Sequence, residues 1–413
     1  MSTRTLPPIP APAERRIAVR VTPEAERALR QGHPWLFGAS IRQQSHPGAP
    51  GDLAVVFDRK GRFLAVGLYD PHAMIRVRVL QRAASAPIDR AWFGAKLAAA
   101  AALRAPLLPA TTGYRLVHGE NDGLPGLVID RYEQTGVLKL YTAAWLPHLR
   151  DVLAALEGVW PAERLVLRLG RALAARPQDL YGLHDGAVLS GPPLDGPVLF
   201  YENGLCFEAD PLHGQKTGFF LDQRENRARV EALARGKDVL NLFAYTGGFS
   251  VYAARGGARR IVSVDTSAPA LEAAARNLAH NRHLPTVAAA IHEAVVEDAF
   301  EALARMGQAD RRFDVVVVDP PAFARKSAQV DQALAAYRHL THLSLSVLRP
   351  GGTLVQASCS APVGAEAFFD AVHHAAVQAG RPLRELERTG HALDHPIVFK
   401  EGAYLKCLFA VAP

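Results

Sequence analysis

The pattern of apolar and polar positions changes along this 413-residue chain, and the change divides it into parts. From about residue 198 onward, short apolar runs alternate with segments of helical spacing, which is typical of a doubly wound parallel sheet. Leu271, Ala274 and Leu278 fall on one helical face, so residues 269–281 are expected to form a crossover helix. The central strands are predicted at residues 239–243, 260–264, 315–318 and 353–357.

The beginning of the chain shows strand periodicity instead. Residues 15–85 contain short alternating segments separated by Gly and Pro clusters, which predicts a small β-barrel. These segments are 53–57, 63–68 and 75–80. Arg76 and Arg78 alternate with apolar side chains in the last of them, so both guanidinium groups are expected on one face of that strand.

Residues 86–197 give mixed signals, which predicts a middle α+β domain. An alanine-rich helical stretch opens it, and strand candidates follow at 127–129, 137–141 and 165–169, with a helix at 146–156. A stretch dense in Gly and Pro, 182–197, marks the boundary with the third part, 198–413. Residues 1–14 carry four prolines and few large apolar groups, so a disordered tail is expected there.

The composition is that of a globular protein, with 49% hydrophobic residues. No uninterrupted apolar run approaches the ~18 residues of a membrane helix, and residues 1–13 lack the apolar block of a signal peptide. We therefore expect a cytoplasmic protein that engages no membrane. Cys206, Cys359 and Cys407 are far apart and lack Cys-x-x-Cys spacing, so neither a disulfide framework nor a metal site is expected.

The formal charge of +7 is unevenly distributed. Residues 1–85 contain 13 Lys and Arg against 6 Asp and Glu, which accounts for the whole excess, because the remainder has 34 of each sign. A local excess of basic groups attracts phosphate backbones and is a footprint of nucleic-acid binding. An ordinary solvated face explains the same count, and both interpretations stay open at this point.

A glycine-containing turn follows the first predicted strand of the third part, in the segment Asn-Leu-Phe-Ala-Tyr-Thr-Gly-Gly-Phe-Ser, residues 241–250. The Gly-x-Gly-x-x-Gly spacing of a dinucleotide site is absent, which disfavours NAD and FAD. A tight turn suits a cofactor without phosphate, such as S-adenosylmethionine. The predicted contacts in the turn are Asn241, Phe243, Tyr245, Thr246 and Gly247.

Two acids extend this predicted cofactor site. Asp265 ends the second strand, close to the ~20-residue separation expected for an acid that binds ribose hydroxyls, although it could also cap a helix. Asp298 is placed to follow the third strand, where a carboxylate can accept from the adenine amino group. A polar segment ahead of the sheet is expected to line the cofactor or the substrate, through Lys216, Thr217, Phe219, Gln223 and Arg224.

The segment Asp319-Pro320-Pro321-Ala322-Phe323 closes a run of valines and resembles the Asp/Asn-Pro-Pro-aromatic loop of nucleic-acid methyltransferases. Prolines stiffen such a turn and leave its carbonyls free to accept from an exocyclic amine, while the aromatic ring can stack on a base. Asp319 is therefore expected at both the cofactor and the substrate, with Pro320, Pro321 and Phe323 against the substrate.

Cys359 ends the next predicted strand with a serine on each side, whereas Cys206 and Cys407 lie among apolar residues and are expected in the core. A thiolate at Cys359 could add to C6 of a cytosine or uracil, so that C5 becomes nucleophilic enough to attack a methyl sulfonium. Asp319 would hydrogen-bond N3 or N4 of the base and stabilise the adduct.

The order of motifs resembles the RlmI/RlmO-type ribosomal RNA cytosine-C5 methyltransferases, from about residue 15 to the end. The motifs are His-Pro-Trp-Leu-Phe at 33–37, Arg-Leu-Val-His-Gly-Glu-Asn-Asp-Gly-Leu-Pro-Gly at 115–126, Lys-Thr-Gly at 216–218, the turn at 241, Asp-Pro-Pro at 319–321, Ser-Cys-Ser at 358–360 and Glu-Gly-Ala-Tyr-Leu-Lys at 401–406.

This resemblance implies an α/β protein: a C-terminal Rossmann-like class I methyltransferase sheet, an N-terminal β-barrel-like PUA domain that binds RNA through groups such as Arg76 and Arg78, and a middle α+β domain. It also implies S-adenosylmethionine as methyl donor and 23S ribosomal RNA as substrate, with Cys359 and Asp319 as catalytic residues. It leaves open whether the chain forms a homodimer. Ala322 stands where the wider cytosine-C5 family has a second cysteine, and Asn241 replaces its usual acid.

Two other functions stay open from the sequence. An exocyclic-amine methyltransferase on RNA would use Asp319, Pro320 and Phe323 and leave Cys359 idle. A non-catalytic RNA-binding assembly factor would depend on the basic N-terminal module alone. Because Ala322 stands where the wider family has a second cysteine, the group that removes the C5 proton is unassigned.

Overall fold

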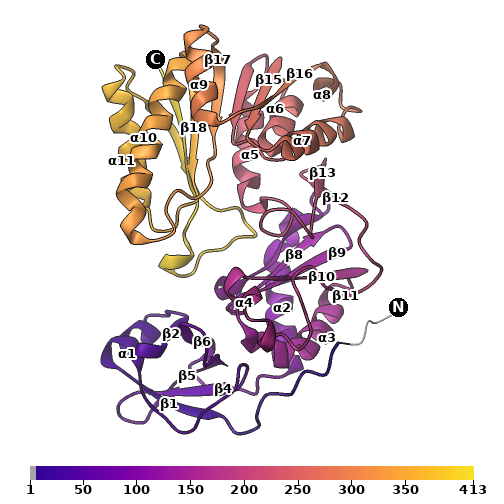
Figure 1. Ribbon diagram of the computed structural model, residues 1–413, viewed down its shortest axis with the longest axis vertical. Coiled ribbons are helices and arrows are strands. Elements are labelled where there is room, and N and C mark those ends of the chain that lie inside the picture. Colours follow the sequence, from indigo (N-terminus) through magenta and orange to yellow (C-terminus); the bar gives the residue numbers. More distant parts are fainter. Residues whose placement is uncertain (1–5) are drawn as a thin grey trace. The chain divides into compact units, whose positions relative to one another are not determined.

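The computed structural model describes residues 6–413, and the chain separates into two compact units (Figure 1). The first unit contains the chain up to Asn203, together with Ala209–Phe219 and Leu393–Lys400. The second contains Gly204–Glu208, Phe220–Ala392 and Glu401–Pro413. Within residues 6–413, none of the helices combines the length and apolar character needed to cross a membrane.

The first unit begins with a six-stranded sheet in the order β2-β6-β5-β4-β1-β3, drawn in indigo in Figure 1. Its strands are β1 (Ile17–Val21), β2 (Trp35–Phe37), β3 (Ile41–Gln44), β4 (Leu53–Phe57), β5 (Phe63–Tyr69) and β6 (Ile75–Arg82). Helix α1 (Pro23–Arg30) is capped by the Thr22 hydroxyl and packs its apolar face on this sheet. Alternate residues of β1 are buried and exposed, as the period-two pattern predicts.

The same unit continues with a five-stranded sheet in the order β11-β10-β9-β8-β7. Its strands are β7 (Gly113–His118), β8 (Leu127–Tyr132), β9 (Thr135–Leu140), β10 (Arg164–Leu169) and β11 (Val188–Ser190). Helices α2 (Arg90–Arg104) and α3 (Leu149–Val159) pack against each other, and the short α4 (Arg171–Ala174) follows β10. The helix predicted at 146–156 starts later, because a 3₁₀ turn with Pro147 inside it, Ala143–His148, precedes α3.

The N-terminal segment differs from the prediction of a disordered tail. Residues 6–13 have no helix or strand, but Leu6 and Ile9 pack partly buried against the core of the middle sheet. The backbone N–H of Ala13 donates to Asp52 Oδ1 at 2.8 Å. These two apolar side chains give the segment something to bury, which its proline content concealed. Residues 1–5 of the predicted tail lie outside the described residues.

The chain passes into the second unit through β12 (Val198–Glu202) and β13 (Leu205–Ala209), and α5 (Arg224–Leu233) precedes its sheet. That sheet has seven strands in the order β16-β15-β14-β17-β18-β20-β19. They are β14 (Asp238–Leu242), β15 (Arg260–Asp265), β16 (Ile291–Val296), β17 (Phe313–Val318), β18 (Leu348–Ser358), β19 (Arg384–Thr389) and β20 (Lys406–Ala412). The first five in this spatial order run parallel, and β20 is antiparallel to both β18 and β19.

Helices cover both faces of this sheet (Figure 1). One group is α5, α6 (Gly248–Arg255), α7 (Ala268–His280) and the short α8 (Pro285–Ala289). The other group is α9 (Ala299–Gln308), α10 (Val330–Val347) and α11 (Ala365–Gln378). The doubly wound sheet predicted from the sequence is confirmed, and each of the four predicted central strands coincides with one of β14, β15, β17 and β18.

Candidate active site

The parallel strands β14, β15, β17 and β18 end at one edge of the sheet, where open α/β sheets bind ligands. The turn after β14, Asp265 at the end of β15, Asp319 after β17 and Cys359 after β18 therefore gather at this edge. The sequence prediction that these groups share one edge follows from the strand order and is confirmed. What each of them does depends on its local contacts.

The turn after β14 has an unusual backbone. Phe243, Tyr245 and Gly247 have φ values of 57°, 46° and 75°, in the left-handed region that disfavours ordinary side chains. The N–H of Tyr245 donates to Asp265 Oδ2 at 2.8 Å, which ties the turn to β15. A Cβ at Gly247 would lie 2.6 Å from the Cβ of Ala274 on α7, so only glycine allows this approach.

Asn241 lies on β14 just before this turn and is buried, with 1% of its surface exposed. Its Nδ2 donates to Ser250 Oγ at 2.9 Å, and that hydroxyl is 2.7 Å from Ser263 Oγ. Asn241 Oδ1 is buried and has no hydrogen-bond partner within the described part of the chain. An orphaned buried acceptor is costly, which points to a donor from a bound molecule.

The two predicted acids have different local roles. Asp265 Oδ1 accepts from the N–H of Ser267 at 2.9 Å, and it is Ser267, not Asp265, that caps α7. The alternative that Asp265 is a helix cap is therefore wrong. Asp298 follows β16 by two residues and caps α9, with Oδ1 accepting from the N–H of Phe300 at 2.9 Å.

The polar segment 216–224 divides between the two units. In the first unit, Thr217 Oγ1 donates to Asp130 Oδ2 at 2.5 Å, the carbonyl of Lys216 accepts from Lys139 Nζ, and Phe219 packs edge-to-face on Phe200. These three residues thus have contacts of their own within the first unit, and their contact with a cofactor stays a prediction. In the second unit, the buried Arg224 forms an ion pair with Glu225, and the buried Gln223 contacts Asp319.

Asp319 is held by a chain of side-chain hydrogen bonds within the second unit. Gln223 Nε2 donates to Asp319 Oδ1 at 2.8 Å, Asn226 Nδ2 donates to Gln223 Oε1 at 2.6 Å, and Thr389 Oγ1 donates to Asn226 Oδ1 at 2.5 Å. Each amide donates through its nitrogen to one neighbour and accepts through its oxygen from the other, which fixes the orientation of both amide groups. The carboxylate of Asp319 is therefore oriented by Gln223, in the 3₁₀ turn just before α5, and through it by Asn226 on α5 and Thr389 on β19. The Asp-Pro-Pro motif contains none of these three residues.

The Asp-Pro-Pro loop and the cysteine are in contact. Cys359 is partly buried, and its Sγ donates to the carbonyl of Pro320 at 3.7 Å. Pro320 is buried and Pro321 is exposed, while the Phe323 ring lies 5.1 Å from that of Tyr337. Phe323 also packs partly against the core, so only one part of its ring is open to a ligand.

The other two cysteines are buried, as predicted from their apolar surroundings. Burial raises the pKa of the Cys206 and Cys407 thiols, which keeps them protonated. Ser358 and Ser360, which flank Cys359, are buried and bonded to the Tyr337 hydroxyl at 2.8 and 2.9 Å. Cys359 is thus the least buried thiol and the one at the polar edge.

One residue of this edge was not predicted from the sequence. Lys406 is buried at the start of β20, and its Nζ donates to the carbonyl of Ser360 at 2.6 Å and to that of Tyr404 at 3.1 Å. It lies in a quoted motif, but only the antiparallel pairing of β20 with β18 brings it beside the cysteine. The described residues contain no group of His, Cys, Asp and Glu side chains that could hold a metal ion.

The arginines predicted to contact substrate from the N-terminal module are engaged elsewhere. Arg78 is buried, and its Nη1 donates at 2.7 Å to Glu120 Oε1, which also accepts from Trp35 Nε1. The Arg78 guanidinium group is therefore not open to a substrate as the prediction of an RNA contact requires, because Glu120 of the middle domain pairs with it. Arg76 is partly buried and donates to the carbonyl of Pro71.

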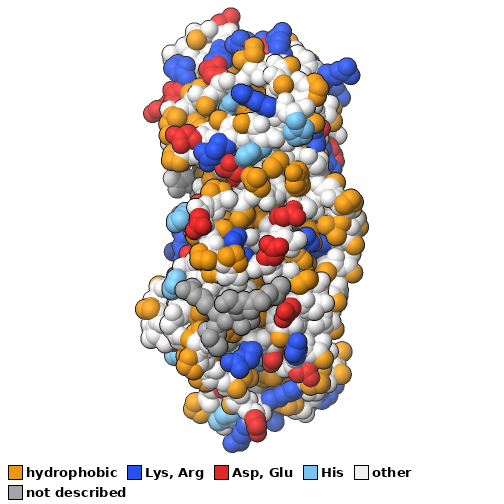
Figure 2. All heavy atoms as spheres, turned by 90° about the vertical axis from the view of Figure 1, so that its right-hand side faces the viewer, with side chains coloured by type: hydrophobic (Ala, Val, Ile, Leu, Met, Phe, Trp, Pro, Cys, Tyr) orange, Lys and Arg blue, Asp and Glu red, His pale blue; other side chains and the backbone are white. Residues whose placement is uncertain are grey.

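A hollow of about 240 Å³ on the same module was missed. It is lined by Ala18, Arg20, Gln43, Ser45, Phe57 and Gly61. Arg20 on β1 is exposed and stands in register between Gln43 on β3 and Phe57 on β4, so the three side chains share one face. Strand alternation could have paired Arg20 with Phe57, but only if the order of strands were known. In the lowest part of Figure 2, where Figure 1 draws β1–β6, Lys and Arg side chains stand among acidic ones.

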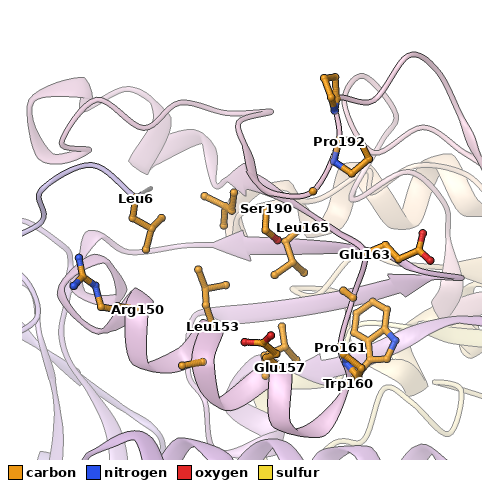
Figure 3. Close-up of a pocket in the computed structure, with 16 residues that line it drawn as sticks. Leu6, Arg150, Leu153, Glu157, Trp160, Pro161, Glu163, Leu165, Ser190 and Pro192 are labelled. Carbon is orange, nitrogen blue, oxygen red and sulfur yellow. The ribbon is translucent and has the colours of Figure 1, made fainter. Parts of the chain in front are cut away.

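A larger pocket of about 890 Å³ lies in the middle domain (Figure 3). Its walls are mostly apolar, from residues such as Leu153, Leu165 and Trp160, and Arg150 and Glu157 also line it (Figure 3). The indole Nε1 of Trp160 is buried without a hydrogen-bond partner in the described residues. This apolar lining differs from the polar edge of the sheet in the second unit, so the volume of a pocket alone does not identify the candidate active site.

The strand order, the glycine turn and the acid at the end of β15 are compatible with an S-adenosylmethionine-dependent methyltransferase. Residues 116–409 match the family model for S-adenosylmethionine-dependent methyltransferases, and residues 19–82 match a PUA-like domain. The chain belongs to this methyltransferase family and carries a PUA-like N-terminal domain.

Relatives and solved structures agree with this assignment. The chain is 49% identical over 406 residues to a ribosomal RNA large subunit methyltransferase of Deinococcus radiodurans, covering 97% of this chain and 98% of the relative. It is 37% identical over 396 residues to ribosomal RNA large subunit methyltransferase I of Pseudoalteromonas translucida, covering 95% and 98%. A structure of a putative SAM-dependent methyltransferase from Streptococcus mutans has the same fold, with a TM-score of 0.79, 23% identity and coverage of 95% and 99%. A putative methyltransferase complexed with SAH matches with the same TM-score.

Proposed function

We propose that the protein methylates C5 of a cytosine in 23S ribosomal RNA, with Cys359 as the nucleophile and S-adenosylmethionine as the donor. One observation carries the chemistry: a partly buried thiol contacts the Asp-Pro-Pro loop at the edge of the sheet where the cofactor turn lies, while both other cysteines are buried. The RNA substrate is supported by the names of relatives that cover almost the whole chain and by the PUA-like domain.

The residues around the turn fit the cofactor, which supplies a methyl group on a sulfonium. The orphaned Oδ1 of Asn241 offers an acceptor for its amino group. Asp265 keeps lone pairs on both carboxylate oxygens after accepting two backbone N–H groups, so it can accept from the ribose hydroxyls. Asp298 has Oδ2 left for the adenine amino group after capping α9 with Oδ1.

The chemical step follows from the thiol and the carboxylate. The sulfur of Cys359 forms a bond to C6 of the cytosine, and the electron pair of the C5–C6 double bond becomes available at C5. C5 then forms a bond to the methyl carbon as the methyl–sulfonium bond breaks. Transfer of the C5 proton to water and elimination of the Cys359 thiolate from C6 then restore the C5–C6 double bond. Asp319, oriented by Gln223, would hydrogen-bond the base at N3 or N4.

The test is methyl transfer to 23S ribosomal RNA, with the product nucleoside identified by mass spectrometry. Wild-type protein is expected to form 5-methylcytidine, and Cys359→Ala to lose at least about 10³-fold in rate, because C5 of an intact pyrimidine is a poor nucleophile. Cys206→Ala is the matched control, since this buried thiol has no role in the proposed step.

Two results would replace this proposal. An N-methylated product that Cys359→Ala still forms would favour the exocyclic-amine methyltransferase, which uses the Asp-Pro-Pro loop and leaves the thiol idle. RNA binding without any methylated product, in the presence of saturating S-adenosylmethionine, would favour an assembly factor.

A further inference from the structure

Lys406 is a buried charge that the proposed reaction does not use. Its side chain is 5% exposed, and it stands opposite Ser358 in the antiparallel ladder between β20 and β18. Its Nζ donates to the carbonyl of Ser360 at 2.6 Å. The carbonyl of Ser360, just after Cys359, thus holds this ammonium group, and Ser358, just before Cys359, lies opposite Lys406 in the backbone ladder.

Burial of an ammonium group is costly unless negative charge compensates it. Two carbonyl oxygens, of Ser360 and Tyr404, supply only partial charges. Burial lowers the pKa of Lys406 to about 8, and a negative charge on Cys359 acts in the opposite direction. The side chain therefore keeps its proton at neutral pH and responds to the charge of the neighbouring thiol.

We propose that Lys406 is a positioning residue whose ammonium group holds Cys359 in the thiolate form. This inference rests on the proposed role of Cys359 as the nucleophile. The sulfur gives up its proton to water, Lys406 keeps its own proton, and no oxidation or reduction occurs. A thiolate formed in advance removes the need for a separate base when the sulfur adds to C6.

Two other titratable groups face the thiol. The negative charge of Asp319, just after β17, opposes thiolate formation. The hydrogen bond from Gln223 Nε2 to Asp319 Oδ1 reduces this effect, because it disperses part of the carboxylate charge. Tyr337, from α10, has its pKa raised by burial and also by the charges of Cys359 and Asp319, so it stays a neutral phenol. In this proposal the ammonium group of Lys406 offsets both the charge of Asp319 and the loss of the hydrogen bond that the Cys359 thiol donates to the Pro320 carbonyl.

The thiolate can be measured without RNA or methyl donor. We expect the rate of alkylation of Cys359 by iodoacetamide, followed against pH by peptide mass spectrometry, to rise with a midpoint below the ~8.5 of a free cysteine. Lys406→Met, which keeps the length of the side chain and removes its charge, should raise this midpoint by about one pH unit. Lys406→Arg, which keeps the charge, should restore most of the difference.

An unchanged midpoint in Lys406→Met, with thermal unfolding like that of the wild type, would overturn the inference. Should that variant fail to fold, the wild-type midpoint decides, because a value at or above ~8.5 contradicts a stabilised thiolate. The result of the alkylation experiment can be distinguished from that of the methyl-transfer experiment. A low midpoint that depends on Lys406, together with full methyl transfer by Cys359→Ala, would remove the covalent mechanism and leave the Lys406–Cys359 pair standing.

Discussion

Gly247 lies in the turn after β14 at a position that has no room for a side chain. Its φ is 75°, and a Cβ added there would lie 2.6 Å from that of Ala274, so any side chain is excluded unless α7 shifts. We expect Gly247→Ala to lower the free energy of unfolding by about 1–3 kcal/mol through overpacking and left-handed strain. Displacement of the turn should also weaken S-adenosylmethionine binding at least tenfold, measured by calorimetry beside a urea unfolding curve.

Gly236→Ala is the matched control for this substitution. Gly236 has a similar φ of 70°, but a Cβ there meets nothing within 4 Å. It should show the strain alone, with stability reduced by about 1 kcal/mol and cofactor binding unchanged. Equal loss of cofactor affinity in both variants would mean that contact between Gly247 and α7 does not set the turn.

How far single residues could be predicted depends on how local their contacts are. Asp265, Asp319 and Cys359 follow apolar strands directly, so their position at the sheet edge could be read from the sequence. Arg78 was misjudged because Glu120, 42 residues away, covers it. Lys406 was missed because its neighbour Ser360 is 46 residues away, and only the fold pairs them.

Among the strands, the start of β14 is joined to its neighbours by a network of charges. Asp238 accepts from Arg259 at 2.7 Å and from Arg349 at 3.0 Å, and its N–H donates to Asp314. Hydrogen bonding from Arg259, followed by that from Arg349, lowers the pKa of Asp238. The folded state therefore binds this proton less tightly than the unfolded state, and the stabilisation is present above about pH 4 and lost as pH falls.

Asp238→Asn should therefore destabilise the protein by about 1 kcal/mol at pH 7, and the difference from wild type should shrink toward pH 3. Urea unfolding at the two pH values measures this. Asp310→Asn is the control, because Asp310 is 86% exposed beside Arg312 and should change stability little at either pH. A difference for Asp238→Asn that is constant with pH would show that the ion pairs do not link β14 to its neighbours.

The predictability of whole strands follows their burial. The four central strands read as continuous apolar runs because helices cover both faces. The edge strand β19 was not predicted, since it reads Arg-Glu-Leu-Glu-Arg-Thr. The other edge strand, β16, was predicted only as a third strand before Asp298, without bounds, since Ile291 and Val296 are more than half exposed. Charged side chains on an edge strand hinder its pairing with other chains. The same charges remove the apolar run from which a strand is predicted.

For the molecule as a whole, the excess of positive charge lies in the same part of the chain as the PUA-like domain. Residues 1–85 hold the whole excess of +7, and residues 19–82 match the PUA-like domain. The sequence predicts RNA binding by this part but not by which side chains, because only the fold shows that Glu120 pairs with Arg78 while Arg20 lines an open hollow. The exposed Arg20, beside Phe57 and Gln43, suits an unpaired nucleotide.

Arg20→Ala should therefore weaken binding of the full-length protein to 23S ribosomal RNA by about 1 kcal/mol, or roughly fivefold. The slope of log affinity against log salt concentration should fall in magnitude by about 1, as expected for the loss of one phosphate contact. Filter binding across a salt series measures both quantities. Arg27→Ala removes the same charge from the same domain, at a side chain that is 71% exposed and 3.6 Å from Glu24. If the two variants lose affinity equally, net charge rather than the Arg20 hollow accounts for the effect. If Arg20→Ala alone loses affinity, the hollow is a point of contact with the RNA.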